Sequence, residues 1–254
     1  MKRIVAVCLL AVGLFATVCA QDARGAMSAA EVAQLEQEAM KYYQAQAFDK
    51  AFPLFLQAAQ QGSAVAQNCV AYCYCHGLGV RQDFQDAVNW WMQAAAKNHV
   101  QAQFFLGESF ERGRGVDRDC SVAAQWYLRA ARQGYAEAQN SLAYLYLTGQ
   151  GVAKNAEMAA TLFRQSAENG FSRAQFNIAN CYYEGNGVKK DLALAFFWYK
   201  KAAEQGLPQA QRSLGICYYN GQGTLKNVAL ARQWWQKAAA QGDARAKSLL
   251  SQYQ

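Results

Sequence analysis

The chain has 254 residues, of which 53% are apolar and 17% are charged, and 25 Lys and Arg against 18 Asp and Glu give a formal charge of +7. This composition is too apolar for a disordered chain, and the length suits one large domain or two small ones. With only two histidines, His76 and His99, little room remains for histidine-based metal or triad chemistry. The charge excess is mild and lacks the concentrated patch typical of nucleic-acid binders, so we predict no nucleic-acid partner.

The first twenty residues have the pattern of a secretory signal peptide. Lys2 and Arg3 form a basic start, and an uncharged, mostly apolar run of about 15 residues follows over 4–18. That run is too short to cross a bilayer comfortably, since a membrane-spanning helix needs about 20 residues. We therefore expect cleavage after Ala20, a short linker over 21–27, a periplasmic or secreted mature chain and no stable membrane span. An uncleaved anchor is the alternative.

A 36-residue repeat dominates the rest of the chain. The motif Gly-x-Gly recurs five times at this spacing, and its first glycines are Gly77, Gly113, Gly149, Gly185 and Gly221. Other positions keep the same period: an Ala-Gln pair, a small residue six before the first glycine and an aromatic residue three before it. A fixed period of this length indicates stacked supersecondary units.

Each repeat is predicted to form two antiparallel helices. In the first repeat, Val70, Ala71 and Tyr74 form an apolar stripe at helical spacing over 64–76. Gly77 ends this first helix, because glycine tolerates the left-handed conformation of a helix C-terminus. Asp or Asn six residues after the first glycine is a favoured N-cap and starts the second helix. We expect aromatic residues of the second helix to fill the gap toward the next repeat, since one pair cannot bury both its faces.

Two further segments flank the five full repeats, which cover residues 64–242. Residues 28–63 lack the glycine loop and are predicted to form a shorter, tetratricopeptide-like helix pair. Pro53 is expected to kink the second helix of this pair, because proline removes a backbone donor. Residues 243–254 are predicted to form a polar helix that caps the C-terminal end. Six pairs and this cap give about thirteen helices in an all-α chain.

The repeat pattern resembles the Sel-like repeat (SLR) family, a relative of the tetratricopeptide repeat. Residues 102–134 show the pattern closely, with Leu106, Gly107, Phe110, Gly113, Gly115, Val116, Asp119, Ala123, Trp126, Tyr127, Ala130, Ala131 and Gly134. The resemblance implies a right-handed α/α solenoid of stacked antiparallel helix pairs, whose first helices line a concave groove. It also implies a non-enzymatic scaffold or adaptor that binds a protein or peptide in that groove.

The same resemblance places the residues nine, five and two positions before each first glycine in the groove. Aromatic side chains interleaved with Asn, Glu and Arg have the composition of a protein interface. The predicted partner-binding residues are Asn68, Tyr72, Phe104, Glu108, Asn140, Tyr144, Phe176, Asn180, Tyr183, Arg212 and Tyr219. For any single aromatic residue of this set, packing between neighbouring repeats is the alternative role.

Other functions find less support in the sequence. The chain has no H-E-x-x-H, G-x-S-x-G or S-x-x-K motif and no phosphate loop, so we predict no catalytic residue, no metal ligand and no cofactor. An envelope hydrolase or a penicillin-binding, β-lactamase-like protein is the alternative function, because cysteine-rich relatives of the family have been considered penicillin-binding enzymes. Dispersed basic residues such as Arg129, Lys154, Lys190 and Lys200 leave nucleic-acid or glycan binding as a third hypothesis.

Six cysteines would remain after cleavage, and an oxidising compartment permits disulfides. Cys181 and Cys217 stand at equivalent positions of neighbouring repeats, where packed helices lie about 10 Å apart. A disulfide needs Cα atoms closer than about 7 Å. We therefore predict that these two are buried thiols, and the state of Cys69, Cys73, Cys75 and Cys120 stays open.

Overall fold

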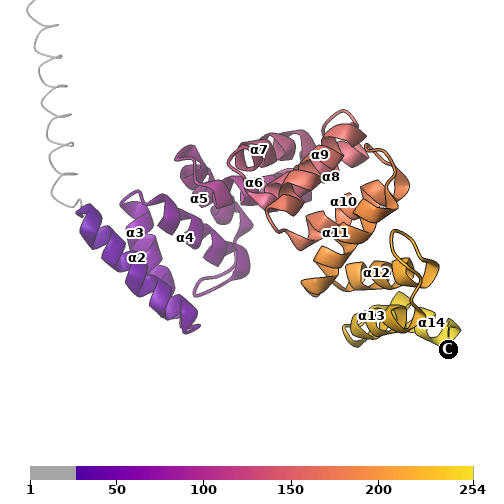
Figure 1. Ribbon diagram of the computed structural model, residues 1–254. Helices are drawn as coiled ribbons and strands as arrows, with labels where there is room; N and C mark the ends of the chain where they lie inside the picture. Colours follow the sequence, from indigo (N-terminus) through magenta and orange to yellow (C-terminus); the bar gives the residue numbers. More distant parts are fainter. Residues whose placement is uncertain (1–26, 254) are drawn as a thin grey trace, which may run out of the picture. The chain divides into compact units, whose positions relative to one another are not determined.

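The computed structural model describes residues 27–253, so the predicted signal peptide and all but the last residue of the predicted linker lie outside the described residues. Residues 27–253 form thirteen helices and no strands, which confirms the predicted all-α class (Figure 1). The helices are α2 (Ala29–Gln44), α3 (Phe48–Gln60), α4 (Ala64–His76), α5 (Phe84–Ala96), α6 (Val100–Arg112), α7 (Cys120–Arg132), α8 (Ala136–Thr148), α9 (Ala156–Glu168), α10 (Ser172–Glu184), α11 (Leu192–Glu204), α12 (Pro208–Asn220), α13 (Val228–Ala240) and α14 (Ala244–Gln252).

Two compact units divide the chain, with the boundary between His99 and Val100. The first unit contains α2 to α5 and the second contains α6 to α14. Within each unit, every helix packs against its neighbours in the chain, which gives stacked helix pairs. We call the first helix of each 36-residue repeat helix A (α4, α6, α8, α10 and α12) and the second helix B (α5, α7, α9, α11 and α13).

The predicted helix ends are confirmed. The first glycine of the motif ends helix A in the left-handed conformation, with φ of 74° at Gly149 and 78° at Gly185. The Asp or Asn six residues later caps helix B: both Ser121 and Val122 donate their backbone N–H to Oδ1 of Asp119. Both caps satisfy backbone groups that have no partner inside the helix. Helix α3 continues through Pro53 to Gln60.

The second glycine of the motif allows two repeats to approach closely. Gly187 has a φ of 72°, and a Cβ added there would lie 2.0 Å from the carbonyl oxygen of Ala156, the first residue of the preceding helix B. Gly223 stands in the same relation to Leu192 in the next repeat, again at 2.0 Å. No side chain fits at this distance, so packing as well as backbone conformation requires glycine here.

Within each unit, a buried glutamine joins neighbouring helix pairs. Gln175 Nε2 donates to the carbonyl oxygen of Ala167, in the last turn of the preceding helix B, at 3.2 Å. Gln205 Nε2 donates to Gln175 Oε1 at 2.8 Å and to the carbonyl oxygen of Gly170 at 3.1 Å. The recurring Ala-Gln pair therefore supplies the polar link of the repeat junction, because a buried carbonyl needs a hydrogen-bond partner. The same glutamine-to-carbonyl bond recurs from Gln67 to Ala59, from Gln139 to Ala131 and from Gln211 to Ala203.

Helix B carries two adjacent aromatic positions that pack in different directions. At the second position, Tyr127 covers Gly107 of its own helix A, where an added Cβ would lie 2.5 Å from the ring. At the first position, Trp198 packs against the core cluster that contains Ala159 and Phe163 of the preceding helix B. The prediction that these rings fill the gap toward the next repeat is confirmed for the second position, since Tyr127 also belongs to the core cluster that contains Ala138 and Leu142 of the next helix A. The first ring packs toward the preceding repeat instead. The small residue of helix A leaves space within its own pair, and the second ring occupies that space.

The replacement Gly187→Ala is expected to destabilise the protein more than Gly170→Ala. Both glycines have positive φ, 72° and 88°, so both variants carry a backbone cost of about 1–2 kcal/mol. A Cβ at position 170 would meet nothing within 4 Å, whereas one at position 187 would collide with Ala156. We expect a total loss on the order of 3 kcal/mol or more for Gly187→Ala in urea unfolding followed by circular dichroism. Equal losses for the two variants would contradict a packing role for the second glycine.

Candidate protein-interaction surface

The predicted partner-binding residues fall on helices A of both units. Asn68 and Tyr72 lie on α4 in the first unit, and the other nine lie on α6, α8, α10 and α12 in the second. We call the nine residues of the second unit the A-helix strip. They are Phe104, Glu108, Asn140, Tyr144, Phe176, Asn180, Tyr183, Arg212 and Tyr219.

Most aromatic residues of the A-helix strip rest on the second aromatic residue of helix B. The ring centroids of Phe104 and Tyr127 lie 5.8 Å apart, as do those of Phe176 and Tyr199. Tyr183 also contacts Tyr199, at 6.4 Å. Because these half-buried rings contact rings that are buried in the core, they are held in fixed positions while part of each remains accessible.

The hydroxyl groups of the buried tyrosines form hydrogen bonds with side chains of helix A. Tyr127 Oη donates to Glu111 Oε2 at 2.6 Å, and Tyr199 Oη donates to Asn180 Oδ1 at 2.6 Å. Burial, the main cause, raises the pKa of both tyrosines above their usual value. Both hydroxyls therefore stay protonated as donors and fix the side chains of Glu111 and Asn180.

Other polar residues of the strip are held along or between helices A. Asn140 Oδ1 accepts a hydrogen bond of 2.9 Å from Asn177 Nδ2, which links α8 to α10. Glu108 pairs with Arg112 one turn later, with 2.9 Å between the charged atoms. Burial raises the pKa of Glu108, and Arg112 opposes that shift only in part. Tyr144 is the most accessible ring, with 49% of its surface exposed.

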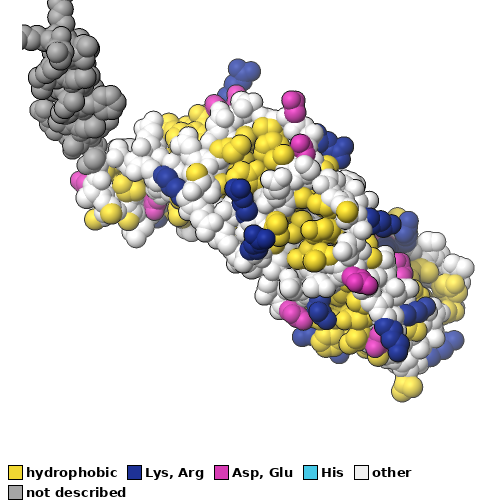
Figure 2. Space-filling model, turned by 90° about the horizontal axis from the view of Figure 1, so that it is seen from above, with side chains coloured by type: hydrophobic (Ala, Val, Ile, Leu, Met, Phe, Trp, Pro, Cys, Tyr) yellow, Lys and Arg dark blue, Asp and Glu magenta, His cyan; other side chains and the backbone are white. Residues whose placement is uncertain are grey.

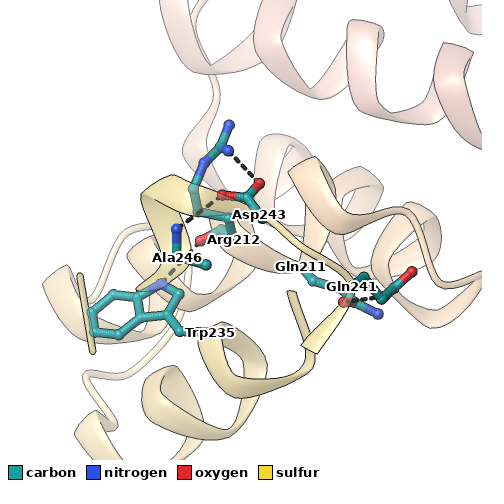
Figure 3. Close-up of polar contacts among 6 residues, drawn as sticks. All are labelled: Gln211, Arg212, Trp235, Gln241, Asp243 and Ala246. Carbon is teal, nitrogen blue, oxygen red and sulfur yellow. Dashed lines mark hydrogen bonds and ion pairs between the residues drawn. The ribbon is translucent and has the colours of Figure 1, made fainter. Parts of the chain in front are cut away.

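Two predicted partner-binding residues are less available to a partner than their repeat position suggests. Asn68 is buried, with only 8% of its surface exposed. Arg212 Nη1 lies 2.5 Å from Asp243 Oδ2, and the other carboxylate oxygen of Asp243 caps α14 by accepting from the Ala246 N–H (Figure 3). Trp235 Nε1 donates to the backbone carbonyl of Arg212 beside this ion pair. The guanidinium of Arg212 thus anchors the terminal helix.

Basic side chains follow the edge of the strip at a regular interval. The position five residues after the first glycine holds a Lys or Arg in each repeat of the second unit. At one of these positions, Lys190 Nζ lies 5.8 Å from the ring centroid of Tyr183. Lys226 lies 5.3 Å from the ring of Tyr219, and each contact is favourable because the face of an aromatic ring attracts a cation. We call this set the basic rim; it consists of Arg118, Lys154, Lys190 and Lys226.

The basic rim is exposed, and none of its four cations forms an ion pair with a carboxylate within residues 27–253. On the face seen in Figure 2, hydrophobic side chains form separate patches with charged side chains between them. Sequence reasoning counted Lys154 and Lys190 among dispersed basic residues and missed their common register. The signal was present in the sequence, as a Lys or Arg directly before the N-cap of each helix B in the second unit.

No group of three or more potential metal ligands occurs in the described part of the chain. Between residues 27 and 253 no disulfide joins the cysteines, and Cys181 and Cys217 are buried. Burial raises the pKa of Cys181 to about 11 and that of Cys217 to about 12, so both remain thiols at neutral pH. None of the helices from α2 to α14 is long and apolar enough to cross a membrane.

The stacked pairs, the glycine loops and the capped end define a helical-repeat protein. The family model described as Sel1 repeat matches residues 46–63, 64–99, 100–135, 136–171, 172–207 and 208–243. The chain therefore belongs to the Sel1 repeat family, which confirms the resemblance to Sel-like repeats. The solenoids of this family commonly serve as scaffolds for protein interactions and are typically non-catalytic.

Solved structures agree with this assignment. A Sel1 repeat protein from Oxalobacter formigenes is 34% identical with a TM-score of 0.79, over 85% of this chain and 86% of that one. A protective antigen of uropathogenic Escherichia coli with an SLR fold is 30% identical with a TM-score of 0.80, over 87% of this chain but only 48% of the antigen. This chain thus spans about half the length of that antigen. An immunity protein from Pseudomonas aeruginosa shares the fold at 17% identity, with a TM-score of 0.52 over 80% of this chain and 81% of that one. No protein with a curated description matches the sequence.

The replacement Asp243→Asn is expected to destabilise the C-terminal end in a pH-dependent way. Burial alone would raise the pKa of Asp243, but the hydrogen bonds from Arg212 and from the backbone of α14 outweigh burial and lower it. The Asp243 carboxylate therefore stabilises the folded state fully above its pKa in the unfolded chain, about 3.9. This stabilisation is lost as the pH falls through the lowered pKa of the folded state. Asn keeps the N-cap but loses the charge, so we expect a loss of about 1–3 kcal/mol at pH 7.

Thermal melts of both proteins between pH 7 and pH 2 would check this expectation. The difference between wild type and Asp243→Asn should shrink as the pH falls. A difference that stays constant with pH would show that the charge of Asp243 does not stabilise the fold through Arg212.

Proposed function

We propose that this protein is a non-enzymatic scaffold that binds an extended segment of a protein or peptide partner along the A-helix strip. The observation that carries the proposal is the support of partly exposed rings by buried ones, as Tyr199 supports Phe176 and Tyr183. A surface fixed in this way loses little conformational entropy when a partner binds, and this raises affinity without any chemical step.

The composition of the strip favours a protein partner. Aromatic side chains provide most of the contact energy in protein interfaces, and polar side chains around them give specificity. Asn140 and Asn180 are amides held in place by Asn177 and Tyr199. Their remaining hydrogen-bonding groups suit the backbone of an extended peptide, which offers one donor and one acceptor per residue.

The basic rim favours an acidic segment. Equivalent positions of neighbouring repeats lie about 10 Å apart, and an extended chain rises about 3.3 Å per residue. An Asp or Glu at every third position would therefore meet successive rim cations. Such complementarity speeds association and selects the register of the bound segment.

We also propose that the protein acts in the periplasm or outside the cell. The support is the basic start and apolar run of the first twenty residues. Cell fractionation and the mass of the mature N-terminus test this proposal. A mature chain that begins at Gln21 in the periplasm or medium is expected, and full-length protein in the cytoplasm would contradict it.

The replacement Tyr144→Ala is expected to weaken partner capture without unfolding the protein, because half of this ring is already exposed. Phe197→Ala is the matched control, since Phe197 is an aromatic residue of similar exposure, 45%, on α11, a helix B. Loss of one contact ring in an interface weakens binding by roughly 1–2 kcal/mol, or about five- to thirtyfold. The measurement is affinity capture from native envelope extracts, quantified by mass spectrometry. Identical partner sets for all three proteins would count against the strip as the binding surface.

The double replacement Lys154→Glu with Lys190→Glu is expected to slow association with a captured partner and to remove most of its salt dependence. Opposite charges steer a partner toward its site, and salt screens that attraction. Lys200→Glu with Lys201→Glu makes the same change in charge on α11, where Lys200 already faces Glu204 at 3.9 Å. Association rates measured from 50 to 500 mM salt distinguish the two double variants. Equal effects on the rate would show that only the net charge of the protein matters and not the position of the rim cations.

A further inference from the structure

A small open pocket lies between α7, α8 and the glycine loop that follows α8. Its volume is about 200 Å³, and its floor is mainly apolar. Ser121 and Gln125 provide polar groups at its exposed side. The complete lining consists of Ser121, Ala124, Gln125, Leu128, Leu142, Tyr146, Gly151 and Val152.

The chain itself shows what fits beside the tyrosine of this pocket. Ala124 occupies the repeat position that Phe196 holds two repeats later, and Tyr146 occupies the position of Tyr218. Phe196 meets Tyr218 edge to face, with ring centroids 5.3 Å apart and planes at 89°. In the first unit, the equivalent rings of Phe52 and Tyr74 adopt nearly the same geometry, at 5.4 Å and 90°. At Ala124 the tyrosine remains and the phenyl ring is missing.

The geometry points to a second docking site, in which this pocket accepts a phenylalanine side chain from a partner protein. An apolar cavity of about 150 Å³ is large enough to bind benzene, so the volume suits one phenyl ring. Leu128, Leu142 and Val152 supply apolar contacts, and Tyr146 offers the ring face that Tyr218 offers to Phe196. Edge-to-face contact between two rings adds to the gain from burial of the apolar surface.

The pocket is separate from the A-helix strip. On α8, Leu142 and Tyr146 are four residues apart and share one side of the helix, whereas Asn140 and Tyr144 project from the other side because a helix has 3.6 residues per turn. A partner can therefore occupy the pocket whether or not the strip is occupied. The inference does not depend on the proposed function of the strip, and either can fail alone.

The test is a titration of the full mature chain with N-acetyl-phenylalanine amide, followed by NMR of ¹³C-labelled Leu and Val methyl groups. We expect saturable shifts at Leu128, Leu142 and Val152, with a dissociation constant on the order of millimolar for a single side chain. Nuclear Overhauser effects should connect the ring protons of the probe to Tyr146. N-acetyl-leucine amide should bind at least about threefold more weakly, because it lacks the edge-to-face contact.

Ala124→Phe fills the pocket from within and should weaken probe binding by at least about tenfold. Ala160→Phe is the matched control: it makes the same replacement at the equivalent position of the next repeat and should leave the shifts unchanged. Shifts that persist in Ala124→Phe, or an absence of saturable shifts in the wild type, would overturn the proposal. So would methyl shifts that change on dilution without probe, since a second copy of the chain would then be the occupant.

Discussion

The contact between neighbouring repeats is the constraint on which the rest of each unit depends. Within each unit, the second glycine of the loop lies directly against the backbone of the preceding helix pair, as Gly187 lies against Ala156, so no side chain can separate the two repeats at that point. Near the other end of the same helix, a buried glutamine binds a backbone carbonyl, as Gln175 binds Ala167 in the last turn of α9. Together these contacts fix the distance and the rotation between repeats, because one sets the closest approach and the other satisfies the buried polar groups.

The interaction surface follows from this constraint. Once helices A and B are fixed, the second aromatic residue of helix B lies under the small residue of helix A, as Tyr127 lies under Gly107. Its hydroxyl then reaches the outer side of helix A and orients Glu111. The core that stabilises each pair thus also positions the rings and polar groups that a partner would meet. Helix α14 follows the last full repeat and packs against α13, and its N-cap Asp243 forms an ion pair with Arg212.

Much of the fold could be predicted from the sequence because the same pattern of residues recurs five times with a 36-residue period. Gly149 and Asp119 marked helix ends by backbone chemistry, which depends on neighbouring residues alone. The interaction surface was harder to predict, since availability depends on contacts between distant residues. The ion pair of Arg212 with Asp243 and the burial of Asn68 result from tertiary packing, which the spacing of residues in the sequence does not reveal. The additional contact of Tyr127 with Gly107, inside its own helix pair, likewise depends on the space that this glycine leaves.

Hydrogen exchange of the variant Gln175→Ala, compared with wild type by mass spectrometry, tests the central claim most directly. If the junction holds neighbouring repeats together, loss of this side chain should speed exchange on both sides of it. Peptides from the end of α9 and from α10 and α11 would then lose protection together, because Gln175 joins Ala167 and Gln205. Faster exchange confined to α10, with α9 and α11 unchanged, would contradict the claim that the repeats stabilise one another through these bonds.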